Sequence, residues 1–138
     1  MKFLIDTNVI IDYLADRDPF AEHAEKVMKL CVNREAEGML TANAVTDIYY
    51  ILRKAIGREE ALESLRTIID VLNIVEVGKN DILQAVEMNM PDFEDAIIAV
   101  CAKRVKAQFI VTRNRKDFMN APVESITPED LLIRLAAS

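Results

Sequence analysis

Glycine, proline, cysteine and histidine are scarce in this 138-residue chain, which has 3, 4, 2 and 1 of them respectively. With so few glycines and prolines there is no low-complexity linker, and no internal repeat is visible, so one domain over residues 1–138 is expected. Cys31 and Cys101 lie in apolar helical patterns without metal-ligand spacing, which predicts reduced thiols packed as small hydrophobes. His23 lies in a polar helical stretch and is expected to be solvated.

Long apolar runs are also missing. The longest ones, such as FLI and AIIAVCA, fall short of the ~18 uninterrupted apolar residues that a membrane span needs. The opening MKFLID has an acid where a signal peptide would still be apolar. Hydrophobic residues nevertheless make up 51% of the chain, which is enough for a substantial core. We therefore expect a soluble, cytoplasmic protein with no membrane partner.

An excess of positive charge is absent as well. The chain has 23 acidic and 17 basic residues, for a formal net charge of −6. Domains that bind nucleic acid by charge alone usually carry a basic surface, so this class is disfavoured. An acidic site that first recruits a divalent cation, and through it a phosphate, remains compatible with the composition.

Apolar strands alternate with helical patterns along the whole chain. Strands are predicted at residues 2–5, 38–41, 73–77, 109–112 and 123–126. Helices are predicted at residues 8–16, 20–34, 44–56, 58–72, 79–89 and 92–106, with a short helix from residue 114 and a last one that begins at Pro128. This alternation predicts an α/β fold, a three-layer α/β/α sandwich around a parallel sheet. In such sheets ligands bind outside the carboxyl ends of the strands.

Acidic residues follow the first two strands. Asp6 comes directly after the first strand, where a helix-entry role near the helix dipole is the ordinary alternative to a functional one. After the second strand, Asn43 is predicted to cap a helix that has Asp47 about one turn inside it. Aspartate is a poor former of helix interiors, although a solvated polar face would also explain Asp47.

Two later segments repeat this arrangement. In NMPDFEDAIIAVCAKR, Asp92 is a natural helix cap, and Asp95 precedes an apolar run with no cation three or four residues on. In FIVTRNRKDF, Asn114 and Asp117 have the spacing of a cap and its partner. A parallel sheet would gather all these side chains along one edge, where like charges must share protons or bind a cation. Carboxylate ligands select a hard ion such as Mg²⁺ or Mn²⁺.

The motifs DTNVIID, AVTDIYYILRK, DFEDAIIAVCA and VTRNRKDF, in this order, resemble those of the PIN domain family, and more narrowly its VapC-type ribonuclease toxins. The resemblance covers essentially the whole chain and implies a five-stranded sheet in the order 3-2-1-4-5. It also implies that Asp6 and Asp95 hold the metal ion. Asp47 stands where the family commonly has a glutamate, and the fourth family acid corresponds to either Asn114 or Asp117.

Further residues take roles from the same resemblance. Asn8 and Thr112 match polar positions that orient the acids, and Asp92 would support Asp95 from outside the ligand set. The implied activity is Mg²⁺- or Mn²⁺-dependent hydrolysis of RNA phosphodiesters, with Asp6, Asp47, Asp95 and Asp117 as catalytic acids. The candidate RNA contacts are Arg53, Lys54, Arg113 and Arg115.

The expected partners are an RNA substrate, a cognate antitoxin and a second copy of the chain. Tyr49, Tyr50, Ile51 and Leu52 offer apolar surface for a homodimer, unless helical spacing places them in the core. The main alternative is a catalytically inactive module that keeps the fold and binds RNA or a protein, since a fold does not by itself fix an activity.

Overall fold

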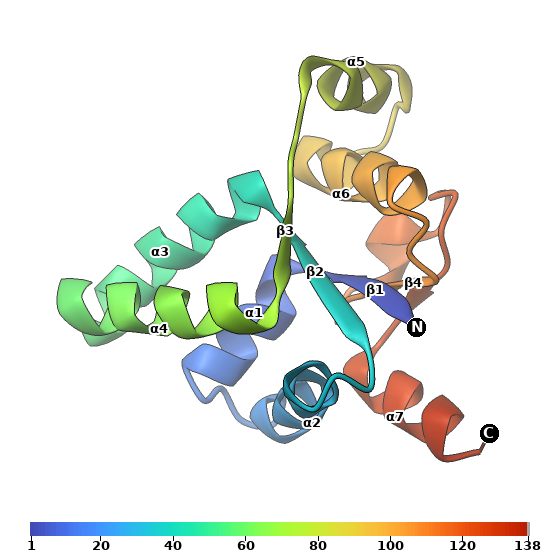
Figure 1. Ribbon diagram of the computed structural model, residues 1–138. Coiled ribbons are helices and arrows are strands. Elements are labelled where there is room, and N and C mark those ends of the chain that lie inside the picture. The colour runs from blue at the N-terminus through green and yellow to red at the C-terminus, as the bar shows by residue number, and fades with distance from the viewer. Residues whose placement is uncertain (138) are drawn as a thin grey trace.

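The computed structural model describes residues 1–137 and is built on one five-stranded parallel sheet (Figure 1). The strands are β1 Lys2–Ile5, β2 Glu37–Thr41, β3 Asn73–Val75, β4 Phe109–Val111 and β5 Ser125–Ile126. Their order across the sheet is β3-β2-β1-β4-β5, and each neighbouring pair is parallel. The α/β fold and the strand order 3-2-1-4-5 are therefore confirmed.

Helices cover both faces of this sheet and complete the three layers (Figure 1). They are α1 Thr7–Leu14, α2 Ala21–Val32, α3 Ala42–Ile56, α4 Arg58–Val71, α5 Lys79–Glu87, α6 Phe93–Arg104 and α7 Pro128–Ala136, with a short 3₁₀ helix, η1, at Arg115–Phe118. Helices α5 and α6 pack on one face, and α1 to α4 with α7 pack on the other. Within residues 1–137, no helix combines the length and the apolar composition of a membrane span.

Successive side chains of the two central strands, β1 and β4, enter two separate cores. In β1, Phe3 and Ile5 pack with α1 to α4 and α7, whereas Leu4 packs with α5 and α6. In β4, Val111 and Ile110 divide between the two cores in the same way. Because side chains alternate along a strand, a strand covered on both faces must be apolar at every position. This explains the uninterrupted FLI of β1.

The predicted side-chain environments hold for the cysteines but not for every residue. Cys31 and Cys101 are free and buried, as predicted. His23 was expected to be solvated, but it is half-buried on α2. Leu52 is fully buried and belongs to the core, so it offers no dimer surface, whereas Tyr50 and Ile51 remain exposed.

Several predicted boundaries were wrong by a few residues. Asn43 is not the cap of α3, because Thr41 holds that position in an extended conformation and the helix begins one residue later. Asn43 lies inside the first turn, and its Oδ1 is buried without a hydrogen-bond partner. The predicted strand 73–77 ends at Val75, and 123–126 shortens to Ser125–Ile126. Strand pairing, which the sequence pattern does not reveal, sets these ends.

The carboxyl ends of the two central strands are held level with each other. The Asp6 amide donates to the Val111 carbonyl at 2.9 Å, and the Thr112 amide donates to the Ile126 carbonyl at 2.9 Å. Strands β1 and β4 are neighbours although more than 100 residues separate them in the chain. The strand order reverses between them, and this is where open α/β sheets bind ligands.

Candidate metal and nucleic-acid site

Asp6 lies at the end of β1 and is buried, with 8% of its surface exposed. Its Oδ1 accepts a hydrogen bond from the Thr7 amide at 2.8 Å, which caps α1. Its Oδ2 accepts from the Thr112 hydroxyl at 2.8 Å and from the Asn8 side-chain amide at 3.3 Å. Asp6 therefore does have the helix-entry role that was predicted as the alternative, through Oδ1. Its Oδ2 belongs to a separate hydrogen-bond network with Thr112 and Asn8.

That network continues away from Asp6 in two directions. The Asn114 amide donates to the Thr112 hydroxyl at 3.0 Å. The Arg113 amide donates to Asn8 Oδ1 at 3.5 Å. Asn8 and Thr112 thus link the amino end of α1 to the turn after β4, and both fix the orientation of the Asp6 carboxylate.

Asp95, in the first turn of α6, is the most perturbed acid near this edge. Its own amide is satisfied by the Asp92 carboxylate, which caps the helix at 3.0 Å as predicted. Burial first, and then the negative charges of Asp6, Asp92, Asp117 and Glu94, raise the pKa of Asp95 from its usual 3.8 to about 7. These effects place the acids within electrostatic reach of one another.

Asp6 shows the same perturbation in a milder form. Burial raises its pKa, the hydrogen bonds from Thr112 and Thr7 lower it, and the charges of Asp117 and Asp92 raise it again, with a net rise above the usual value. Asp117, on η1, thus acts on both Asp6 and Asp95. We call Asp6, Asp47, Asp92, Glu94, Asp95 and Asp117 the acidic cluster.

Glu94 belongs to this cluster although the sequence analysis did not single it out. Its pKa is raised by burial, by the charges of Asp47, Asp92 and Asp6, and by a hydrogen bond to the Asp47 carboxyl. Asp47 on α3 therefore meets the other acids through Glu94 on α6. The signal was present, since Glu94 directly precedes Asp95 in the DFED segment.

Cations neutralise the other buried acids but not Asp6. Asp12 pairs with Arg113 at 2.5 Å, and Asp81 pairs with Arg104 at 2.9 Å. Among the described residues, no ion pair involves Asp6, Asp95 or any other member of the acidic cluster. The fold thus leaves a buried carboxylate beside several like charges without a basic partner.

The carboxylates of the acidic cluster lie too far apart to form a complete set of metal ligands. Within residues 1–137, no three Asp, Glu, His or Cys side chains approach closely enough to hold a metal ion as they stand. Mutual repulsion among unneutralised acids favours such spreading. The acidic cluster nevertheless suits a hard divalent cation. Its side chains are carboxylates, which provide oxygen ligands, they repel one another, and none of them is paired with a described basic side chain.

Asn114 and Asp117 differ in their positions. Asp117 lines a small cavity of about 120 Å³ together with Asp92, Asp95 and Lys116. Asn114 lines a different cavity. The arrangement therefore brings Asp117, rather than the Asn114 side chain, to the other acids.

The basic residues predicted to contact RNA are dispersed. Arg113 is committed to Asp12, and Arg115 donates to the Ser125 carbonyl at 3.2 Å. Arg53 and Lys54 lie exposed in the last turns of α3, about 9 Å along the helix axis from Asp47. Lys116 is the basic residue that lines the same small cavity as Asp95 and Asp117.

The raised pKa of Asp95 predicts a pH-dependent stability in the presence of a chelator. Between its usual pKa of 3.8 and about 7, the folded protein keeps the Asp95 proton while the unfolded chain has lost it, so stability falls as the pH rises through this window. Asp95 is half-exposed, and after allowance for solvent screening the penalty is about 1 to 2 kcal/mol. Thermal melts should show Asp95→Asn to be roughly 3 to 8 °C more stable than the wild type at pH 8. The two proteins should converge towards pH 5; a gain that does not change with pH would contradict the assignment.

Removing the hydroxyl of Thr112 should weaken metal binding without loss of the fold. Thr112→Val keeps the side-chain shape but deprives Asp6 of its 2.8 Å hydrogen bond. Loss of such an orienting contact typically costs 10- to 100-fold in metal affinity, and about that is expected here for Mn²⁺ measured by calorimetry. Thr112→Ser, which keeps the hydroxyl, should bind Mn²⁺ nearly as well as the wild type. Equal affinity of the Val variant and the wild type would remove Thr112 from the site.

A family model and a relative of known name each match most of this chain. A protein-family model described as "PIN domain" matches residues 2–116. Over 138 residues the chain is 26% identical to Ribonuclease VapC1 of Aquifex aeolicus (strain VF5), with 96% of this chain and 94% of that protein covered.

Solved structures show the same similarity at lower identity. DNA-bound VapBC from Salmonella typhimurium aligns with a TM-score of 0.71 and 18% identity, covering 93% of this chain and 98% of that one. PAE2754 from Pyrobaculum aerophilum aligns with a TM-score of 0.64 and 21% identity, covering 100% of this chain and 91% of that one. At these identities the structural similarity shows the fold alone.

Proposed function

The chain belongs to the PIN domain family, and from this premise we propose that it is a divalent-metal-dependent endoribonuclease and the toxin of a type II toxin–antitoxin pair. The observation that carries the proposal is the contrast among buried acids: Asp12 and Asp81 each have an arginine, whereas Asp6 has none and faces further acids. A buried carboxylate without a counter-charge is costly, so its retention at the ligand-binding edge points to an external cation.

The residues suited to hold Mg²⁺ or Mn²⁺ are Asp6, Asp95 and Asp117. Asn114 stays a weaker candidate, because its side chain lines another cavity. Activation of water and neutralisation of charge on a phosphate are the chemistry that such an ion supplies when bound. The net charge of −6 then presents no obstacle to RNA binding, since an ion in the acidic cluster would attract the phosphate.

The protein's own groups have separate tasks in this proposal. Thr112 and Asn8 both donate to Oδ2 of Asp6 and so hold its carboxylate in one orientation. Burial and the negative charge of Asp47 raise the pKa of Glu94, so Glu94 is the acid proposed to give a proton to a leaving oxygen. Lys116, which lines the same cavity as Asp95 and Asp117, is the proposed contact for the phosphate.

The relatives' names support the proposed partners. Ribonuclease VapC1 is named for cleavage of RNA, and the Salmonella structure is a DNA-bound VapBC. An antitoxin that neutralises the acidic cluster, with an arginine as the natural ligand, is the partner proposed here. Homodimer formation through the exposed Tyr50 and Ile51 is a further part of the proposal.

The test is cleavage of labelled RNA. Purified protein incubated with tRNA, mRNA and rRNA in Mn²⁺ should give discrete fragments from at least one of them, and excess chelator should stop the reaction. An inactive module that only binds RNA or a protein would leave all three RNAs intact in Mn²⁺. Cleavage that persists in chelator, or that co-purifies equally with an Asp6→Asn variant, would assign the activity to a contaminant and reject the proposal.

A further inference from the structure

We propose that a cavity beside the acidic cluster binds a nucleobase of single-stranded RNA, one nucleotide from the phosphate that is cleaved. This base pocket has a volume of about 350 Å³, and the residues that matter to it are Phe20, His23, Arg113, Asn114, Thr127 and Glu129. The inference rests on the proposed ribonuclease function and adds to it the means by which the substrate is held.

Hydrogen bonds link the base pocket to the candidate site. Asn114, which lines the pocket, donates its amide to the Thr112 hydroxyl, and that hydroxyl donates to Asp6. Arg113, the residue between them, also lines the pocket and donates its amide to Asn8. A chain with its phosphate near Asp6 thus has a recess for a flanking base on the other side of Asn114.

The wall of the pocket provides a flat surface for stacking. The Arg113 guanidinium lies over the Phe20 ring, with its central carbon 4.1 Å from the ring centroid. Phe20 is 40% exposed, and the Arg113 side chain is 26% exposed. Single-stranded RNA is commonly held by stacking of its bases on aromatic rings and on arginine planes.

The polar groups of the pocket suit an uncharged ring better than a phosphate. Arg113 is neutralised by Asp12, so Glu129 carries the remaining formal charge of the lining. The side chains of His23 and Asn114 make no hydrogen bond with any described residue. Thr127 accepts from the Asp130 amide at 3.1 Å and keeps its hydroxyl proton free to donate. These groups are donors and acceptors of the kind that base edges require.

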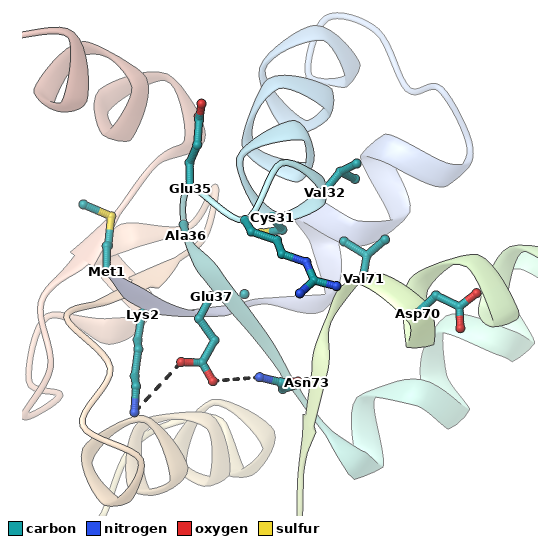
Figure 2. A pocket seen from close by; sticks show the side chains of 12 residues that line it. Met1, Lys2, Cys31, Val32, Glu35, Ala36, Glu37, Asp70, Val71 and Asn73 are labelled. Atoms are coloured by element: carbon teal, nitrogen blue, oxygen red, sulfur yellow. Dashed lines mark hydrogen bonds and ion pairs between the residues drawn. The ribbon is translucent and has the colours of Figure 1, made fainter.

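Another cavity of the molecule lacks these properties. A cavity of about 670 Å³ lies at the amino end of the sheet, and no aromatic side chain lines it (Figure 2). Figure 2 shows Lys2 and Asn73 both joined to Glu37, so these polar groups satisfy one another. It is at the opposite end of β1 from Asp6, and no member of the acidic cluster lines it.

The test compares intact and abasic RNA. The probe is a short, labelled single-stranded oligoribonucleotide from an RNA that the wild type cleaves in Mn²⁺, made also with one abasic nucleotide at each position beside the cleaved bond. For the wild type, one abasic position should lower kcat/KM about 5- to 100-fold. Phe20→Leu should cleave the intact RNA with a kcat/KM about 5- to 100-fold below that of the wild type. In this variant the same abasic position should lower kcat/KM by less than about 2-fold further.

Controls separate the inference from the proposed function. Phe20→Tyr keeps a stacking ring and should keep the abasic penalty, as should Ile133→Ala, an exposed position on α7 outside the pocket. The Mn²⁺ affinity of Phe20→Leu should equal that of the wild type. Cleavage of intact RNA with no abasic penalty, or with the same penalty in Phe20→Leu, would overturn the base pocket and leave the nuclease standing. Absence of cleavage by the wild type would overturn both.

Discussion

Asp95→Asn is expected to lower the rate of Mn²⁺-dependent RNA cleavage by at least about 10²- to 10³-fold, the scale on which single groups stabilise developing charge. Asp95 is the acid on which the cluster acts most strongly, since burial and the charges of Asp6, Asp92, Asp117 and Glu94 raise its pKa to about 7. Asparagine keeps the shape but removes the negative charge that holds a cation. The measurement is the initial rate of cleavage of the best RNA substrate at saturating Mn²⁺.

The stability of this variant distinguishes loss of function from loss of fold. Replacing the Asp95 carboxylate by an amide removes its repulsion by the other acids of the cluster. In the presence of chelator, the melting temperature of Asp95→Asn should therefore equal or exceed that of the wild type. Asp70→Asn, an exposed position on α4, is the matched control and should retain full activity. Full activity of Asp95→Asn would remove Asp95 from the site, and a lowered melting temperature would make its inactivity uninformative.

Asp12→Ala is expected to lower the free energy of unfolding by about 3 kcal/mol, as when one partner of a buried ion pair is removed. Asp12 is 1% exposed and accepts two hydrogen bonds from Arg113, at 2.5 and 3.2 Å. Without it the Arg113 guanidinium keeps its contact with the Phe20 ring but loses its counter-charge. Urea denaturation at constant pH measures the effect.

A comparison with an exposed pair and a double variant makes this prediction specific. Glu63→Ala breaks the exposed pair with Arg66 and should change stability by less than about 0.5 kcal/mol. Arg113→Ala in the Asp12→Ala background should cost much less than it does in the wild type, because the stranded charge is already unpaired. Additive losses in the double variant would mean that the pair contributes packing but little electrostatic stabilisation.

The fold was largely readable from the sequence because local patterns and the global arrangement agree. FLI, AIIAVCA and FIV are apolar at every position, as a sheet and a helix buried on all sides require, and α3 ends at residue 56 as predicted, with Gly57 following it at a φ of +87. The pattern does not report pairing partners, so the ends of β3 and β5 were misplaced by two residues each. The cap of α3 was assigned to Asn43 by residue preference, but the course of β2 places Thr41 there.

The sequence analysis singled out the principal acids of the candidate site and the residues that support them, but it did not single out every acid with a partner near this edge. Asp6, Asp95 and Asp117 directly follow a strand or open a helix, so topology alone brings them together. Asp12 and Glu94 were missed because their roles depend on side chains distant in the chain, Arg113 and Asp47. An acid inside the apolar VIID stretch was the available signal for Asp12, since a buried carboxylate requires a partner. For the same reason the ion pair between Arg113 and Asp12 was not foreseen, whereas the predicted RNA contact of Arg113 stays a prediction.

Calorimetric titration of the protein with Mn²⁺ near pH 7 tests most directly whether the unpaired acids at the carboxyl edge hold a divalent ion. We predict saturable binding accompanied by proton release, because Asp95 is partly protonated at this pH and must ionise. Titrations in buffers of different ionisation enthalpy should reveal that release. Asp6→Asn and Asp95→Asn should each abolish the binding of Mn²⁺ and the proton release with it. Absence of Mn²⁺ binding by the wild type, or binding by both variants that equals that of the wild type, would contradict the account.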